Sequence, residues 1–322
     1  MRYVEVGGVR VSAIGLGTWQ YGSREWGYGK DYAEHEAGAI TRRALDLGVN
    51  LIDTAEIYGF GRSERIVGRA IQGRRQDAFL ATKVFPVMPL AAVVEQRGRA
   101  SARRLGVDHI DLYQVHWPNP VVPLGTTMDG MRRLRDAGLI RHVGVSNFGL
   151  GRWQEAERAL GGPVLSNQVE YSMVARKPER EVLPWAQEQG RILIAYSPLA
   201  QGFLSGKYGA GATAPGAVRA GNALFLPENL DRAQPLLDSL REVARAHDAT
   251  PAQVALAWVI RRPNVVAIPG ASSVAQLEAN AAAADIQLSD EEDKALTNAA
   301  DAFSPIGGVA ALPKLARARL RR

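Results

Sequence analysis

The chain has 322 residues, of which 46% are hydrophobic and 22% charged, a balance typical of a folded globular protein rather than a disordered one. It contains no cysteine, which excludes disulfides, iron–sulfur clusters and thiol catalysis. The net charge is +6, but residues 314–322 hold five basic and no acidic side chains, so the remainder carries +6 − 5 = +1. The basic character belongs mainly to this tail, which is either simply solvated or binds anions, and it does not predict a nucleic-acid partner.

The N-terminal segment predicts a β-hairpin, because alternating side chains in residues 2–13 flank Gly7 and Gly8. The segment lacks the uninterrupted apolar core of a signal peptide. The longest apolar stretch, residues 84–94, is about half as long as a membrane span and contains two prolines. We therefore expect a cytoplasmic protein with no membrane partner.

Eight short apolar runs follow the hairpin and predict strands. Most lack strict alternation, which is typical of strands buried on both faces of a parallel sheet. The runs are residues 13–17, 50–53, 78–83, 110–116, 142–146, 165–170, 192–197 and 265–270.

Helical periodicities separate these runs, and several end in glycine, which suits a left-handed helix cap. They cover residues 34–48, 63–73, 94–106, 127–138, 151–161 and 178–190. This alternation predicts one (β/α)8 TIM barrel over residues 1–322, with an N-terminal β-hairpin and a C-terminal extension. A doubly wound sheet would carry a Gly-rich phosphate turn. The nearest segments, 15–20 and 59–64, have Gln20 and Glu64 at the third glycine position.

Polar side chains stand where these predicted strands end. In a barrel, chemistry is found at the C-terminal ends of the strands, so we expect these side chains to converge on one rim. They are Asp53, Lys83, His116, Ser146, Asn147, Gln168, Tyr196 and Ser197.

Asp53, Lys83, Tyr58 and His116 form a candidate catalytic set. Neighbouring strand ends bring Asp53 to Lys83, and Tyr58 in the next loop can fold back over both. The Lys83 ammonium would lower the pKa of Tyr58 and make it a usable proton donor. A neutral His116 would either orient a carbonyl through its ring N–H or share the proton. Taken singly, these residues also suit a buried ion pair, a surface aromatic and a core histidine. The other four histidines show no metal-ligand spacing, so we predict no metal site.

Several blocks together resemble the aldo-keto reductase superfamily. They occur in order along nearly the whole chain, from GLGTW (15–19) to IPGASSVAQLEAN (268–280). Between them lie LIDTAEIYGFGRSERIVG, ATK, IDLYQVHWP, GVSNF and AYSPLAQGFLSGKY. HWPNPVVP and IPGASS are closest to bacterial stress-type reductases and potassium-channel beta subunits.

The resemblance implies NADPH-dependent reduction of aldehydes or ketones, with Tyr58 as general acid, Asp53 and Lys83 as its tuning pair, and His116 orienting the carbonyl. It implies that Ser146, Asn147 and Gln168 hold the nicotinamide amide while Tyr196 stacks on the ring. Further cofactor contacts are expected from Trp19, Ser197, Leu199, Gln201, Lys207, Arg219, Pro269 and Gly270. The glycine-containing loop with Lys207 and Arg219 is either a clamp over the pyrophosphate or a disordered insert.

The resemblance places the adenosine end of the cofactor at the helix N-terminus after the last strand. Ser272, Ser273 and Gln276 would contact the 2′-phosphate region, and Asn280 the adenine. Many family members have Arg in place of Gln276 and Glu in place of Ala279. Because Gln is a poorer phosphate partner than Arg, this departure weakens the expected preference for NADPH.

Four aromatic side chains are candidates for the pocket of a small carbonyl substrate, although each could equally anchor a loop: Trp19, Tyr21, Trp26 and Trp117. Two rival functions remain. One is a nicotinamide-sensing regulatory subunit that binds a partner protein. The other is a barrel lyase or aldolase that uses Lys83 as a Schiff-base nucleophile.

Overall fold

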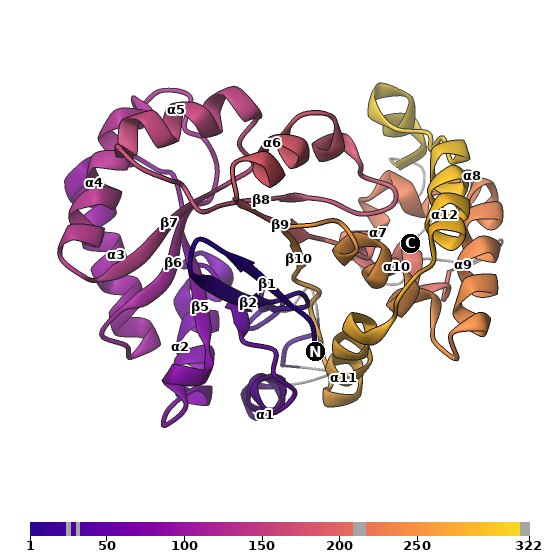
Figure 1. The fold of residues 1–322 in the computed structure, drawn as a ribbon, viewed down its shortest axis with the longest axis horizontal. Coiled ribbons are helices and arrows are strands. Elements are labelled where there is room, and N and C mark those ends of the chain that lie inside the picture. The colour runs from indigo at the N-terminus through magenta and orange to yellow at the C-terminus, as the bar shows by residue number, and fades with distance from the viewer. Residues whose placement is uncertain (24–26, 30–32, 209–216, 316–322) are drawn as a thin grey trace.

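Eight parallel strands form the centre of the computed structural model, which describes residues 1–23, 27–29, 33–208 and 217–315. Each strand pairs with the next along the chain, and bridges Ile14–Ala267 and Gly17–Gly270 join the last to the first. The sheet is therefore closed, which confirms the predicted (β/α)8 barrel (Figure 1). The strands are β3 (Leu16–Gly17), β4 (Leu51–Asp53), β5 (Phe79–Val84), β6 (Ile110–Val115), β7 (Ile140–Ser146), β8 (Ser166–Glu170), β9 (Ile192–Tyr196) and β10 (Val265–Ala267).

Helices cover the outside of the barrel (Figure 1). Those between the strands up to β9 are α1 (Glu34–Asp46), α2 (Arg62–Ala70), α3 (Ala91–Leu105), α4 (Leu124–Asp136), α5 (Leu150–Leu160) and α6 (Val182–Glu188). They correspond to the six predicted periodicities, with shifted ends. The last is the shortest, because a 3-10 turn at Lys177–Arg180 and a non-helical Glu181 (φ −141°, ψ −48°) precede it.

The sequence analysis identified no helix between β9 and β10, where the described part of the chain has four α-helices. They are α7 (Ala217–Ala220), α8 (Pro227–Arg232), α9 (Gln234–Ala246) and α10 (Pro251–Ile260); α11 (Val274–Ala282) and α12 (Asp290–Ala302) follow β10. Helix α10 is buried from Val254 to Ile260 without interruption. A helix that is apolar all round has no amphipathic period, so periodicity did not reveal it.

The predicted N-terminal hairpin is confirmed as β1 (Tyr3–Val6) paired antiparallel with β2 (Val9–Ser12). Val6, Val9 and Val11 belong to the same buried cluster as Leu51 and Leu112, which lie near the starts of their strands. The hairpin therefore plugs the N-terminal end of the barrel.

Among the described residues, no helix is both long and apolar enough to span a bilayer. Of the basic tail, the structure describes Lys314 and Leu315, and Lys314 forms an ion pair with Glu228 on α8.

Candidate active site

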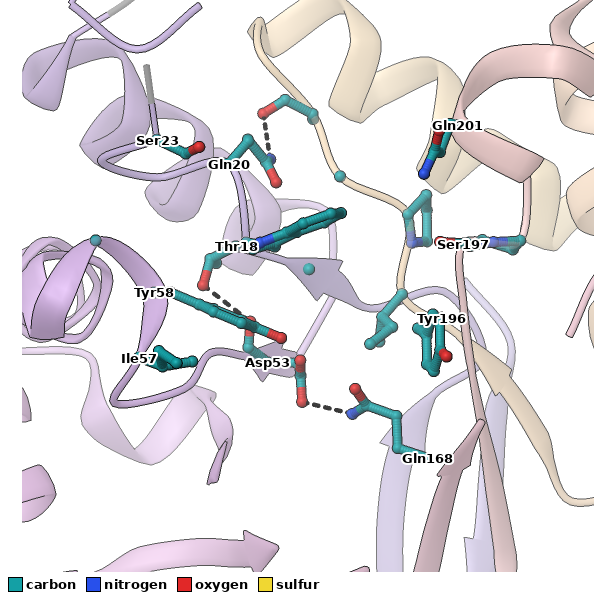
Figure 2. Close-up of a pocket in the computed structure, with 18 of the residues that line it drawn as sticks. Thr18, Gln20, Ser23, Asp53, Ile57, Tyr58, Gln168, Tyr196, Ser197 and Gln201 are labelled. Atoms are coloured by element: carbon teal, nitrogen blue, oxygen red, sulfur yellow. Dashed lines mark hydrogen bonds between the residues drawn. The ribbon is translucent and has the colours of Figure 1, made fainter. Parts of the chain in front are cut away.

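The C-terminal ends of the strands surround a cavity of about 1460 Å³. Most of the predicted site residues line it: Trp19, Asp53, Tyr58, His116, Trp117, Ser146, Asn147, Gln168, Tyr196, Ser197, Leu199, Gln201, Arg219, Pro269, Gly270, Ser272 and Gln276. Figure 2 shows Tyr58 and Asp53 on one side of this cavity and Gln168, Tyr196 and Ser197 on the other.

Lys83 lies fully buried beneath the cavity and donates hydrogen bonds to three oxygens. Its Nζ is 2.5 Å from Oδ1 of Asp53, 2.9 Å from the Thr54 carbonyl and 3.3 Å from the Tyr58 hydroxyl. Burial alone would lower the pKa of Lys83, but its interactions with Asp53 and Tyr58 outweigh it and the net shift is upward. The side chain is thus a fixed cation between the carboxylate and the phenol.

Tyr58 is a partly buried phenol whose pKa is raised above its ordinary value. Burial is the main cause; the Lys83 ammonium acts in the opposite direction, and the Asp53 carboxylate raises the pKa further. The sequence analysis expected Lys83 to lower this pKa. The ammonium does act that way, but the expected net direction is wrong because desolvation of the phenolate is the larger effect.

His116 is a neutral imidazole at the base of the cavity. Burial, with a smaller contribution from the Lys83 charge, lowers its pKa to about 2. Its ring stacks on Trp117 with centroids 4.1 Å apart and meets Tyr58 edge-on at 5.8 Å. This agrees with the neutral state assumed for His116 from the sequence.

The second carboxylate oxygen of Asp53 accepts hydrogen bonds from two glutamines. Nε2 of Gln168 is 2.8 Å from Oδ2, and Nε2 of Gln114 is 3.3 Å away. Gln168, expected to hold a nicotinamide amide, therefore gives its N–H to the ion pair. Sequence reasoning missed Gln114, which lies in β6 two residues before His116, the residue that directly follows the strand.

A chain of hydrogen bonds orients Tyr196. Its hydroxyl donates to Oδ1 of Asn147 at 3.0 Å, Nδ2 of Asn147 donates to Oγ of Ser146 at 3.1 Å, and Oγ of Ser146 donates to the Gln168 carbonyl at 2.9 Å. Asn147 has φ 62°, a left-handed conformation that Asn tolerates better than most residues. The Tyr196 ring is thus held against the wall of the cavity.

The far end of the cavity is the N-terminus of α11. Oε1 of Gln276 accepts from the Ser272 N–H at 2.9 Å, and the Gln276 N–H donates to Oγ of Ser273 at 3.2 Å. Asn280 is buried and donates to the Gly270 carbonyl at 3.2 Å. Ser273 and Asn280 therefore shape this loop without lining the cavity.

The remaining predicted residues lie elsewhere. Tyr21 was expected at the substrate pocket, but its side chain is buried in the core, where its hydroxyl is 3.2 Å from Oγ1 of Thr41 on α1. Lys207 is exposed and does not line the cavity, whereas Arg219 does and donates to the Gln201 carbonyl at 2.9 Å. Trp26 lies outside the described residues.

The cavity also includes residues that the sequence analysis did not identify: Thr18, Gln20, Ile57, Phe60, Arg62, Phe85 and Glu170 among them. Most of them follow the end of a strand by one to seven positions. Their position in the loops at the rim of the barrel was therefore the one feature of the sequence that could have indicated them. Their side-chain types alone suit an ordinary loop.

A family model described as "Aldo/keto reductase family" matches residues 13–301. An uncharacterized oxidoreductase of Mycobacterium tuberculosis is 56% identical, over 100% of both chains. Methylglyoxal reductase YeaE of Escherichia coli is 36% identical over 89% of this chain and 90% of that protein. An aldo/keto reductase of Klebsiella pneumoniae, crystallised with NADP and acetate, is 35% identical, with a TM-score of 0.74 over 94% of this chain and 95% of that one.

Proposed function

Because this chain belongs to the aldo/keto reductase family, whose members among its relatives are oxidoreductases, we propose that it reduces aldehydes or ketones to alcohols with NADPH. One observation carries the proposal. At the base of a large cavity, a single buried ammonium contacts both a carboxylate and a phenol, beside a neutral imidazole.

The four side chains have distinct roles in this proposal. The raised pKa keeps Tyr58 protonated at neutral pH, so its hydroxyl is a proton source for the carbonyl oxygen. The Lys83 ammonium, 3.3 Å from that hydroxyl, stabilises the phenolate left behind until solvent returns the proton. Asp53 holds Lys83 in place, and His116 offers a neutral ring to orient the carbonyl.

The order of chemical groups along the cavity fits a nicotinamide dinucleotide. The Tyr196 ring and the amide of Asn147 lie near the catalytic residues, Arg219 lies beside the loop of Gln201, and the α11 N-terminus lies at the far end. These would hold the nicotinamide, the pyrophosphate and the adenosine, respectively. When bound, the reduced nicotinamide supplies the hydride that goes to the carbonyl carbon.

The Schiff-base alternative lacks support from the geometry. Imine formation needs a neutral amine that a substrate can reach, whereas Lys83 is fully buried and its pKa is raised. Borohydride trapping of carbonyl compounds on Lys83 would be the result in favour of the lyase.

The test is NADPH oxidation by the purified protein with a panel of aromatic and aliphatic aldehydes, with NADH in parallel and the Tyr58→Phe variant beside it. We expect turnover by the wild type and a loss of about 10²–10⁴-fold in kcat for Tyr58→Phe, the range for removing a general acid. NADPH affinity, followed by its fluorescence, should be retained. Tight NADPH binding without any turnover would instead favour the regulatory subunit.

A further inference from the structure

Large hydrophobic side chains remain exposed mainly around the active-site mouth. Among the described residues, those in the segments that follow β3, β4, β5 and β6 are Trp19, Ile57, Phe60, Val87, Met88, Leu90, Trp117 and Val121. The others, Val309 and Leu312, lie near the C-terminal end. A concentration of exposed apolar side chains on one face marks a binding surface more often than an accident of packing.

Two of these side chains also stand on unfavourable backbone. Phe60 has φ 54° and is 91% exposed, and Met88 has φ 48° and is 60% exposed. Bulky side chains are disfavoured in the left-handed region, and these two gain little from burial in return. The stability of the fold does not explain why large apolar side chains occupy these two strained, exposed positions. Backbone strain of this kind concentrates at ligand-binding sites.

Hydrogen bonds and an ion pair hold together the loops that carry these side chains. The Glu56 carboxylate accepts from the Phe85 N–H at 2.5 Å and pairs with Arg97 at 2.9 Å. Arg97 donates in turn to the carbonyls of Phe85 at 2.7 Å and Val87 at 3.2 Å. The loops after β4 and β5 are therefore fixed to each other.

The loop after β6 joins the same assembly. Nδ2 of Asn119 donates to the Pro86 carbonyl at 2.8 Å, and Oδ1 of Asn119 accepts from the Val121 N–H at 2.7 Å. Phe60, Val87, Met88 and Val121 thus lie on three connected loops, and we name these four side chains the apolar ledge.

Phe60 connects the ledge to the cavity, because it is the ledge residue that also lines the cavity. Ile57, Phe60, Phe85 and Trp117 line the cavity, and the rings of Phe85 and Trp117 meet edge-on with centroids 6.1 Å apart. Figure 2 shows Ile57 beside Tyr58, on the side away from Gln168 and Tyr196. An apolar path therefore leads outward from the proposed proton donor, on the side opposite the proposed nicotinamide contacts.

We propose that the apolar ledge binds the hydrocarbon tail of a long-chain carbonyl substrate whose carbonyl group lies at Tyr58. This inference rests on the proposed function. A substrate tail is the occupant that the continuity of ledge and cavity supports, because Phe60 belongs to both. The protein then selects long aldehydes or ketones over short ones.

The experiment measures kcat/KM with NADPH for straight-chain aldehydes from propanal to decanal. A fully buried methylene is worth about fourfold in binding, so a tail covered on one side should gain about twofold per methylene. In the double variant Phe60→Asn/Met88→Asn, the decanal-to-propanal ratio should fall by about tenfold or more. Asn accepts left-handed backbone, so these changes remove apolar surface without adding strain.

Two further variants separate the ledge from general effects of substitution. Val309→Asn replaces a side chain that is 83% exposed near the C-terminal end, and it should leave the ratio unchanged. Phe60→Leu keeps an apolar side chain at the ledge and should retain most of the preference for decanal. Urea unfolding of each variant shows whether the protein remains folded.

Three results would overturn the proposal. One is a wild-type rate that does not depend on chain length, and another is an unchanged ratio in the double variant. The third is a change in oligomeric mass in the double variant with an unchanged ratio, which would make the ledge a protein interface. If no aldehyde of any length is reduced, the proposed function itself fails, and the substrate tail fails with it.

Discussion

Gln168 donates a hydrogen bond of 2.8 Å to Asp53 across the interior of the barrel. Their strands, β8 and β4, lie four positions apart in a closed sheet of eight, so the contact joins opposite walls. Asp53 is thereby held from one side by Gln168 and from the other by Lys83, 2.5 Å away. The geometry of the proposed proton donor thus depends on both walls.

Replacing Asp53 by Asn should destabilise the protein and slow the reaction. The Lys83 ammonium would remain buried without its counter-charge, a change that typically costs about 3–5 kcal/mol in the free energy of unfolding. Urea unfolding measures the stability and NADPH oxidation measures kcat.

The control for Asp53→Asn is Glu5→Gln, which removes the exposed partner of Arg10. Its cost should stay below about 1 kcal/mol, the usual limit for an exposed ion pair. Equal losses in the two variants would show that the buried pair has no special role.

The kcat/KM for reduction should not change with pH around neutrality. His116, with a pKa of about 2, stays uncharged throughout the working range. The pKa of Tyr58 is raised above its ordinary value of 10.0, so the proton that it donates is lost only in strong alkali. We expect kcat/KM to be flat from about pH 6 to about pH 9 and to fall at higher pH.

A rise or fall centred between pH 6 and pH 7, about where a free histidine titrates, would contradict the neutral state of His116. The His116→Asn variant identifies the source of such a limb, because the limb should vanish with the imidazole.

Replacing Gln276 by Arg should strengthen the preference for NADPH. A guanidinium at the α11 N-terminus would meet a 2′-phosphate with charge-assisted hydrogen bonds, worth about tenfold or more in affinity. KM for NADPH should fall while KM for NADH stays the same. Gln276→Met is the control, since it removes the contact with the Ser272 N–H but adds no charge. An equal change for both cofactors would argue against a phosphate at this position.

Replacing Gly68 by Ala should destabilise the barrel, because helices α2 and α3 touch there. An added Cβ would lie 2.3 Å from the Leu105 carbonyl oxygen, so backbone must move. Overpacking of this kind costs about 1–3 kcal/mol. Gly125→Ala, at a helical glycine with nothing within 4 Å of the added Cβ, should cost nothing. Thermal unfolding compares the two variants, and similar midpoints would refute the close contact.

The sequence predicted which side chains gather at the cavity, because Asp53 and Lys83 lie near the ends of buried strands, His116 directly follows one, and Tyr58 lies in the loop after β4. Asp53, Lys83 and His116 are unusual at the ends of apolar runs, and barrel topology makes them neighbours. Gln114 escaped notice because a neutral amide within a strand resembles ordinary alternation. Its role becomes visible only when the carboxylate it contacts is placed in space.

Two further differences came from tertiary contacts. The ring of Tyr21 turns inward to Thr41 rather than outward to the cavity, and residue type in a loop does not encode that choice. The pKa of Tyr58 depends on a balance between burial and the Lys83 charge. The sequence predicts that the charge is near, but not how much water the fold removes.

The N-terminal hairpin restricts how small molecules can enter and leave the cavity. Val6, Val9 and Val11 close the N-terminal end of the barrel, so the cavity opens only at the C-terminal rim of the strands. A substrate that enters to reach Tyr58 and the product that leaves must therefore use the same opening, next to Phe60. We therefore expect product release through this opening, rather than proton transfer, to limit kcat.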